Sequence, residues 1–113
     1  MNKRDELIEK YAADLREKCG QEPDMELLRK VTIGLGPTIY NADSSTVAAS
    51  DPTEVDRLKQ NFLVKKLGLT DGPELDAAID AAFETYGKSN RTKYRAVLCY
   101  LLTKHFGKEA IYA

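Results

Sequence analysis

The residues best suited to chemistry form a short basic run near the end of the chain. Residues 88–95 read Lys-Ser-Asn-Arg-Thr-Lys-Tyr-Arg and hold four cations. We expect this run to open the last helix, where unpaired backbone N–H groups favour a bound anion. Cations at this position oppose the helix dipole, which predicts a negative group nearby. The candidate contacts for a phosphate group are Ser89, Asn90, Arg91, Lys93 and Arg95.

Two kinds of negative group could lie beside this run. The helix expected before it carries four carboxylates, namely Glu74, Asp76, Asp80 and Glu84. The other candidate is a phosphate, either on a small ligand or on nucleic acid. Because surface charges are mostly solvated and contribute little, the sequence favours the internal pairing over the ligand.

The same region has the outline of a helix-turn-helix motif, with the last helix in the recognition position. If Gly87 is the turn glycine, an apolar residue should follow, and Lys88 stands there instead. Lys93 falls where a buried aliphatic side chain is needed. The chain has 17 basic and 18 acidic residues, for a net charge of −1. This balance removes the general attraction to nucleic acid, so the sequence disfavours that partner.

Residues for catalysis or metal binding are few. His105 is the single histidine, and we expect it to be packed or at the rim of the inner face of the last helix. Cys19 and Cys99 are the other residues of a type that binds zinc. No pair among these three residues has the spacing of a zinc site. No nucleophile has an evident neighbouring base. The sequence therefore predicts no catalytic residue, no metal ligand and no cofactor, and it favours a protein that is not an enzyme.

Aromatic residues near the end of the chain suggest an interaction surface. The apolar stripe of the last helix is formed by Val97, Leu98, Leu101 and Leu102. Tyr100 points away from this stripe, and the short tail adds Ile111 and Tyr112. Tyrosine is common at protein interfaces. These three residues are the predicted interface, although the tail could equally fold back over the core.

Five helices must position these residues. Apolar residues at helical spacing predict helices over residues 5–18, 24–35, 51–67 and 73–86, and a last helix from a cap at Ser89 or Asn90 to a stop at Gly107. Glycine stops most of them, and Asp24 and Asp51 are good N-caps. No stretch alternates as a strand would. The sequence predicts an all-α fold, a compact five-helix single domain over residues 1–113.

The connection from Gly36 to Ser50 is the least regular part of the chain. It has one charged residue, Asp43, whereas disordered linkers are richer in charge. It also contains Ile39, Tyr40 and Val47, which are suited to packing. We therefore predict one long ordered loop on the helices, with one or two short helical turns.

The first residues of the sequence are charged and polar. They lack the apolar segment of a secretory signal, and no later segment has the roughly 20 apolar residues of a membrane span. With two scattered cysteines, this composition predicts a cytoplasmic protein without a membrane contact.

Four parts of the sequence resemble a known family: residues 24–35, 36–43, 61–69 and 90–112. Together they resemble a small bacterial family known only as domain of unknown function 2853. The resemblance implies a bacterial, cytoplasmic, free-standing helical protein, and it transfers no catalytic residue, substrate or cofactor.

Two functional hypotheses follow. The first is a non-enzymatic helical interaction module that self-associates or binds a protein partner through Tyr100 and the tail. The alternative is an anion-binding domain that places a phosphate at the basic start of the last helix.

Overall fold

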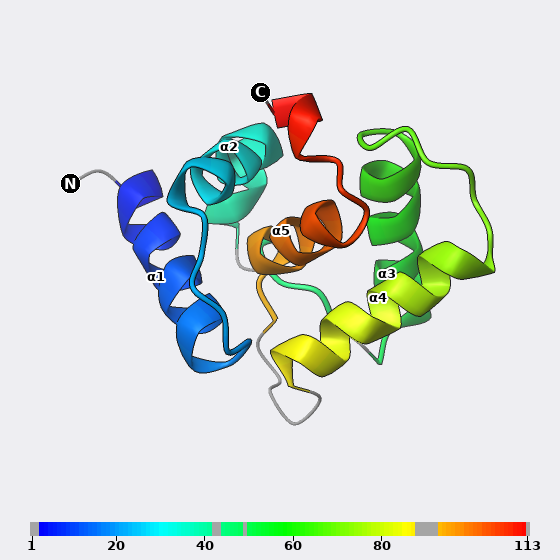
Figure 1. Cartoon of the computed structure of the whole chain (residues 1–113), viewed down its shortest axis with the longest axis horizontal. Coiled ribbons are helices and arrows are strands. Elements are labelled where there is room, and N and C mark those ends of the chain that lie inside the picture. The colour runs from blue at the N-terminus through cyan, green and yellow to red at the C-terminus, as the bar shows by residue number, and fades with distance from the viewer. Residues whose placement is uncertain (1–2, 42–43, 49, 88–92, 113) are drawn as a thin grey trace.

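The last long helix, α5 (Arg95–His105), forms the centre of the molecule. In the computed structural model, which describes residues 3–41, 44–48, 50–87 and 93–112, α5 lies between two pairs of helices (Figure 1). Every residue from Ala96 to Thr103 is buried. A helix with no polar face is suited to such a position. The buried hydroxyl of Thr103 donates to the carbonyl of Cys99 at 2.7 Å.

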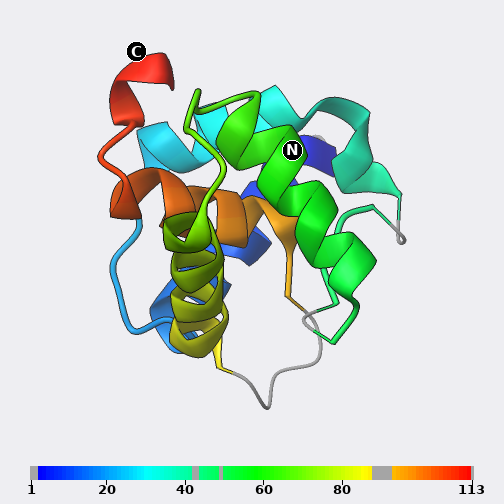
Figure 2. The same cartoon turned by 90° about the vertical axis from the view of Figure 1, so that its right-hand side faces the viewer.

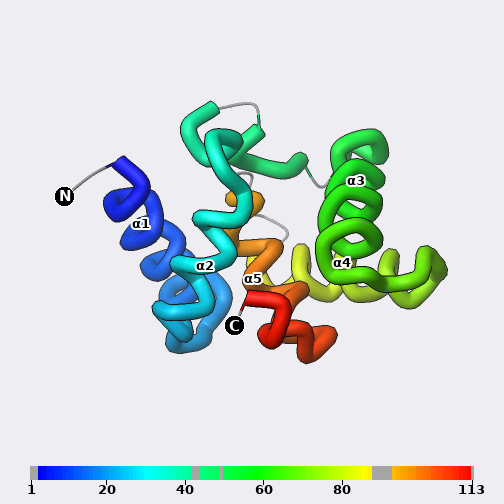
Figure 3. Tube along the Cα trace, turned by 90° about the horizontal axis from the view of Figure 1, so that it is seen from above, coloured from blue at the N-terminus to red at the C-terminus, as the bar shows by residue number. Residues whose placement is uncertain are grey.

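Helices α1 (Lys3–Glu17) and α2 (Met25–Leu35) pack on one side of α5, as Figure 3 shows from above. Asp24 is the N-cap of α2, and its carboxylate accepts a hydrogen bond from the Leu27 N–H at 3.2 Å. Gly36 ends α2 with a φ of 64°, in the left-handed region that glycine adopts most easily. The predicted cap and stop of this helix are therefore confirmed.

Helices α3 (Pro52–Leu58) and α4 (Pro73–Tyr86) lie on the other side of α5 and cross each other (Figure 2). Asp51 caps α3 and accepts from the Thr53 N–H at 3.0 Å. The chain then continues without a break into η2 (Lys59–Val64), which is a π-helix. The sequence predicted one regular helix over residues 51–67. The difference is a widened turn, in which the Leu67 N–H reaches back five residues to the carbonyl of Phe62 at 2.9 Å.

The connection after α2 is ordered where it is described, as predicted. It begins with the short 3-10 helix η1 (Gly36–Tyr40), and Ile39 and Val47 are buried. Two backbone hydrogen bonds join it to the start of α5: Val47 N–H to the Lys93 carbonyl at 2.9 Å, and Arg95 N–H to the Ser45 carbonyl at 2.8 Å. These bonds tie the connection to the central helix. A second 3-10 turn, η3 (Glu109–Tyr112), forms the tail.

The predicted all-α fold with five helices is confirmed, and the described part of the chain contains no β-strand. The predicted caps of the last helix, Ser89 and Asn90, lie outside the described residues, and the described helix begins at Arg95. Within the described ranges, no helix combines the length and the apolar character needed to cross a membrane.

Candidate functional site

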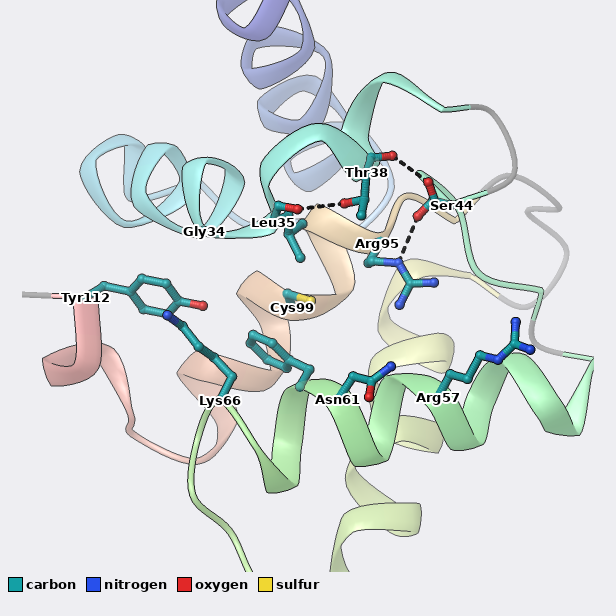
Figure 4. Close-up of a pocket in the computed structure, with 11 residues that line it drawn as sticks. Gly34, Leu35, Thr38, Ser44, Arg57, Asn61, Lys66, Arg95, Cys99 and Tyr112 are labelled. Carbon is teal, nitrogen blue, oxygen red and sulfur yellow. Dashed lines mark hydrogen bonds between the residues drawn. The ribbon is translucent and has the colours of Figure 1, made fainter.

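A cavity of about 390 Å³ opens where α2, η1, η2 and α5 meet beneath the tail (Figure 4). Cavities that bind small molecules typically measure about 300–1,000 Å³, so this one is at the smaller end of that range. Its lining combines basic, polar and apolar side chains from four separate parts of the chain. The lining residues are Gly34, Leu35, Thr38, Ser44, Arg57, Asn61, Phe62, Lys66, Arg95, Cys99 and Tyr112.

The charge of this lining is of one sign. It includes the cations Arg57, Lys66 and Arg95 and no aspartate or glutamate. None of the ion pairs within the described ranges involves these three residues. Lys59, on the same helix but outside the cavity, instead pairs with Asp71 and Asp76 at 3.3 and 3.2 Å. Like charges in a concave site concentrate the electrostatic field, so the cavity attracts anions.

Arg95 is fixed by the loop that precedes α3. Its Nε donates to the backbone carbonyl of Ser44 at 2.8 Å, and Figure 4 shows its two terminal nitrogens extending toward the helix that carries Asn61. The Ser44 hydroxyl in turn donates to the Thr38 carbonyl at 2.9 Å. A guanidinium held through Nε can still present its terminal N–H groups as a fork to a carboxylate or phosphate.

The π-helix places Lys66 on the same face as Arg57. These residues are nine positions apart, and at about 100° per residue a regular α-helix would put them on opposite faces. A π turn holds about one more residue than an α turn, which removes about 100° of that rotation. As a result Arg57, Asn61 and Lys66 all line the cavity. Such turns occur often at functional sites.

The lining also includes the apolar side chains of Leu35 and Phe62 and the thiol of Cys99. Cys99 is fully buried, and burial raises the pKa of its thiol to about 12. The side chain therefore stays a neutral thiol at physiological pH and is not an activated nucleophile. Its role in the lining is that of a small apolar surface.

Tyr112 forms the end of the cavity nearest the tail. Its ring lies beneath the ammonium of Lys66, with Nζ 5.2 Å from the ring centre. It also lies against α2, where a Cβ added to Gly34 would come within 3.4 Å of the ring. Burial raises the pKa of the Tyr112 phenol, so this hydroxyl remains protonated. The tail thus contributes a wall and one polar group to the site.

The predicted anion-binding residues occupy different places. Arg95 lines the cavity, and Ser89, Asn90 and Arg91 lie outside the described residues. Lys93 does not line it: its side chain is only 3% exposed, and desolvation lowers its pKa. The cations that sequence reasoning missed come from α3 and from the turn that follows η2. The signal that could have found them is the five-residue spacing of buried residues, Leu58 to Leu63 and Phe62 to Leu67, which indicates a π turn.

The expectation that Tyr100 is exposed is wrong. Only 1% of the residue is exposed, and its hydroxyl accepts a hydrogen bond from the Asp24 N–H at 2.8 Å. The reason is that α5 has helices on both sides, so the side opposite its apolar stripe is also covered. Of the other predicted interface residues, Ile111 is 41% exposed and Tyr112 is partly buried against the core. The tail therefore folds back over the core, as the second interpretation had it.

His105 is exposed at the end of α5, where it lines a smaller cavity with Leu101 and Leu102, so of its two expected places the packed one is wrong and the rim remains. Its ring contacts that of Phe106 edge-on, with centres 4.9 Å apart. Among the described residues, no group of three histidine, cysteine or acidic side chains could hold a metal ion.

The sequence profile of one protein family matches residues 10–110, and the family is described as a protein of unknown function, DUF2853. The match covers most of the chain, so the chain belongs to this family, as the resemblance of its sequence indicated. A comparison with curated proteins finds no match.

Proposed function

We propose that this member of the DUF2853 family binds a small organic anion in the cavity between α2, η1, η2 and α5. The observation that carries the proposal is the lining itself, which has three cations and no carboxylate. The three cations of one lining repel each other, and a bound anion would reduce this repulsion. Hydroxyl and amide groups on Thr38, Ser44 and Asn61 could orient such an anion.

The lining supports binding better than it supports catalysis. Its cysteine is buried and protonated, and it includes no histidine or carboxylate that could act as a base. Two free cysteines in the chain, Cys19 and Cys99, favour a reducing compartment, so a cytoplasmic location is part of the proposal.

The cavity is a stronger basis for a function than the predicted interface. That interface needed Tyr100 on the surface, and this side chain is buried. Ile111 remains exposed in the tail, but scattered exposed apolar residues are normal on a protein surface. We therefore place anion binding first and self-association second.

A thermal-shift screen of the full chain against small carboxylates and phosphate esters tests the proposal. A ligand at one hundred times its dissociation constant should stabilise the protein by about 2.7 kcal/mol, which raises the melting temperature by several degrees. Arg57→Ala and Arg95→Ala should each reduce the shift produced by any hit.

Arg29→Ala is the matched control, because it removes the same charge from α2 at an exposed site whose guanidinium pairs with Asp5 at 3.2 Å. Its shift should equal that of the unmodified protein. No shift with any anion, or an equal loss in all three variants, would contradict binding in the cavity.

A further inference from the structure

The cations of the cavity lie at two separate ends. In Figure 4, Arg57 and Arg95 lie at the end near Ser44, and Lys66 lies at the other end beside Tyr112. Cys99 lies between these groups. The positive charge is therefore divided between two places within the cavity.

One small anion could not contact both ends. Arg57 and Lys66 are nine residues apart, about two turns along the helix axis. Their side chains also extend away from each other, that of Lys66 toward the ring of Tyr112 (Figure 4). The cation–π contact with this ring restrains the ammonium at its own end. Each end thus offers a separate contact for a negative group.

The two ends differ in the geometry they offer. Arg95 is held through Nε by Ser44 and can present two parallel N–H groups, which fit a planar carboxylate or a phosphate. Lys66 offers a single point charge without a preferred plane. The Arg end is therefore suited to fixing the orientation of the ligand, and the Lys end to compensating a second charge.

The cavity has no charged side chain between its two ends. Figure 4 shows Cys99 and the amide of Asn61 there, and the lining also includes the apolar side chains of Leu35 and Phe62. A further charge placed there would lose its hydration without gaining an opposite charge, which costs free energy. A ligand that contacts both ends must therefore be uncharged between its negative groups.

From this arrangement we infer that the ligand is an organic dianion, with two negative groups joined by a short uncharged chain. The inference rests on the proposed function and specifies the class of anion. Carboxylates and phosphate esters both provide such groups. In either case the ligand has a negative charge at each of its ends.

Isothermal titration of the full chain tests the inference. The probes are saturated α,ω-dicarboxylates from succinate to sebacate, each compared with the monocarboxylate of equal carbon number. We expect at least one dicarboxylate to bind about tenfold tighter or more than its monocarboxylate, because a hydrogen bond to a charged group contributes about this factor. A second arm uses monocarboxylates with a phosphate ester at the far end; tighter binding there identifies phosphate as the natural group.

Lys66→Met should abolish the advantage of the dicarboxylate over the monocarboxylate of equal carbon number. Lys65→Met is the matched control, since Lys65 is its exposed neighbour outside the lining. If monocarboxylates and dicarboxylates bind equally well and Arg95→Ala weakens both, the inference of a dianion is wrong. The proposed function, binding of an anion in the cavity, then still holds. If no probe binds in either arm, both proposals fail.

Discussion

The hydroxyl of Tyr100 accepts a hydrogen bond from the backbone N–H of Asp24 at 2.8 Å. This contact joins the central helix α5 to the residue that caps α2, 76 positions away in the sequence. Asp24 thus has two roles at one place, since its carboxylate also accepts from the Leu27 N–H. Tyr100 fixes where α2 begins relative to the core.

We therefore expect Tyr100→Phe to lower the free energy of unfolding by about 1–3 kcal/mol, because it leaves the Asp24 N–H without its acceptor. Tyr40→Phe is the control, since Tyr40 is 53% exposed and its change should be within about 0.5 kcal/mol. Urea unfolding followed by circular dichroism measures both. Equal stability of the two variants would show that the contact contributes little.

A second tyrosine makes the same kind of connection between α4 and α1. The Tyr86 hydroxyl donates to the carboxylate of Asp14 and accepts from the Tyr94 N–H at 3.3 Å. Asp14 is 7% exposed, so this hydrogen bond is the main compensation for its burial, with Lys18 contributing at 3.5 Å. The pair is a polar contact inside a mostly apolar core.

Because the partners contact each other directly, Tyr86→Phe and Asp14→Asn should not be additive. Each should destabilise the protein by about 1–3 kcal/mol, and the double variant by less than their sum. A double-mutant cycle from urea midpoints gives the coupling energy, which we expect to be at least about 0.5 kcal/mol. Strict additivity would mean that the two groups stabilise the fold independently.

Stability should decrease in alkaline solution. Burial raises the pKa of Tyr11 and of the Cys99 thiol to about 12, and burial together with the hydrogen bond to Asp14 raises that of Tyr86. As pH rises, these groups lose their protons in the unfolded chain before they do so in the folded protein. The stability that they contribute is therefore present at lower pH and is lost as pH rises from about 9 to about 12. Lys93, whose pKa burial lowers, acts in the opposite direction over part of this range.

Tyr11→Phe isolates one contribution to this pH dependence. The Tyr11 hydroxyl is buried and has no hydrogen-bond partner in the described part of the chain, so its removal should not destabilise the protein at neutral pH. The variant should lose less stability than the unmodified protein between pH about 8 and about 11. Urea midpoints at the two pH values provide the comparison, and an identical loss in both proteins would argue against a role for this phenol.

Local signals in the sequence explain why the helices were predictable. Asp24 and Asp51 accept from backbone N–H groups at the starts of α2 and α3. Gly36 and Gly107 adopt positive φ where the chain leaves a helix. Each of these features depends on a few adjacent residues, so a single sequence contains the information.

The burial of Tyr100 and the position of the cavity were not predictable in this way. A single apolar stripe predicts a helix with one buried side, whereas α5 has neighbours on both sides. The cavity needs Arg57 and Arg95 to meet across two helices that are separated in sequence. Both features depend on the packing order of the helices, which no short segment encodes.

The π turn formed by η2, which follows α3, predicts that one residue can be deleted there without unfolding the protein. It accommodates one residue more than a regular helix while keeping Leu58 and Leu63 in the core. Deletion of Gln60 should therefore convert η2 into a regular α-helix without rotating either end. Gln60 contributes an exposed hydrogen bond to Asp71, so the deletion should change the free energy of unfolding by less than about 1 kcal/mol.

Deletion of Asp80 is the control, because it removes one exposed residue from α4, a regular helix. There the loss of one residue rotates the two halves of the helix by about 100° and exposes part of its apolar face. We expect the Gln60 deletion to fold and the Asp80 deletion to unfold or to lose more than about 3 kcal/mol. Thermal unfolding measures the stability of both variants. If the two deletions lower the stability equally, the π turn holds no extra residue. The position of Lys66 in the cavity lining would then need another explanation.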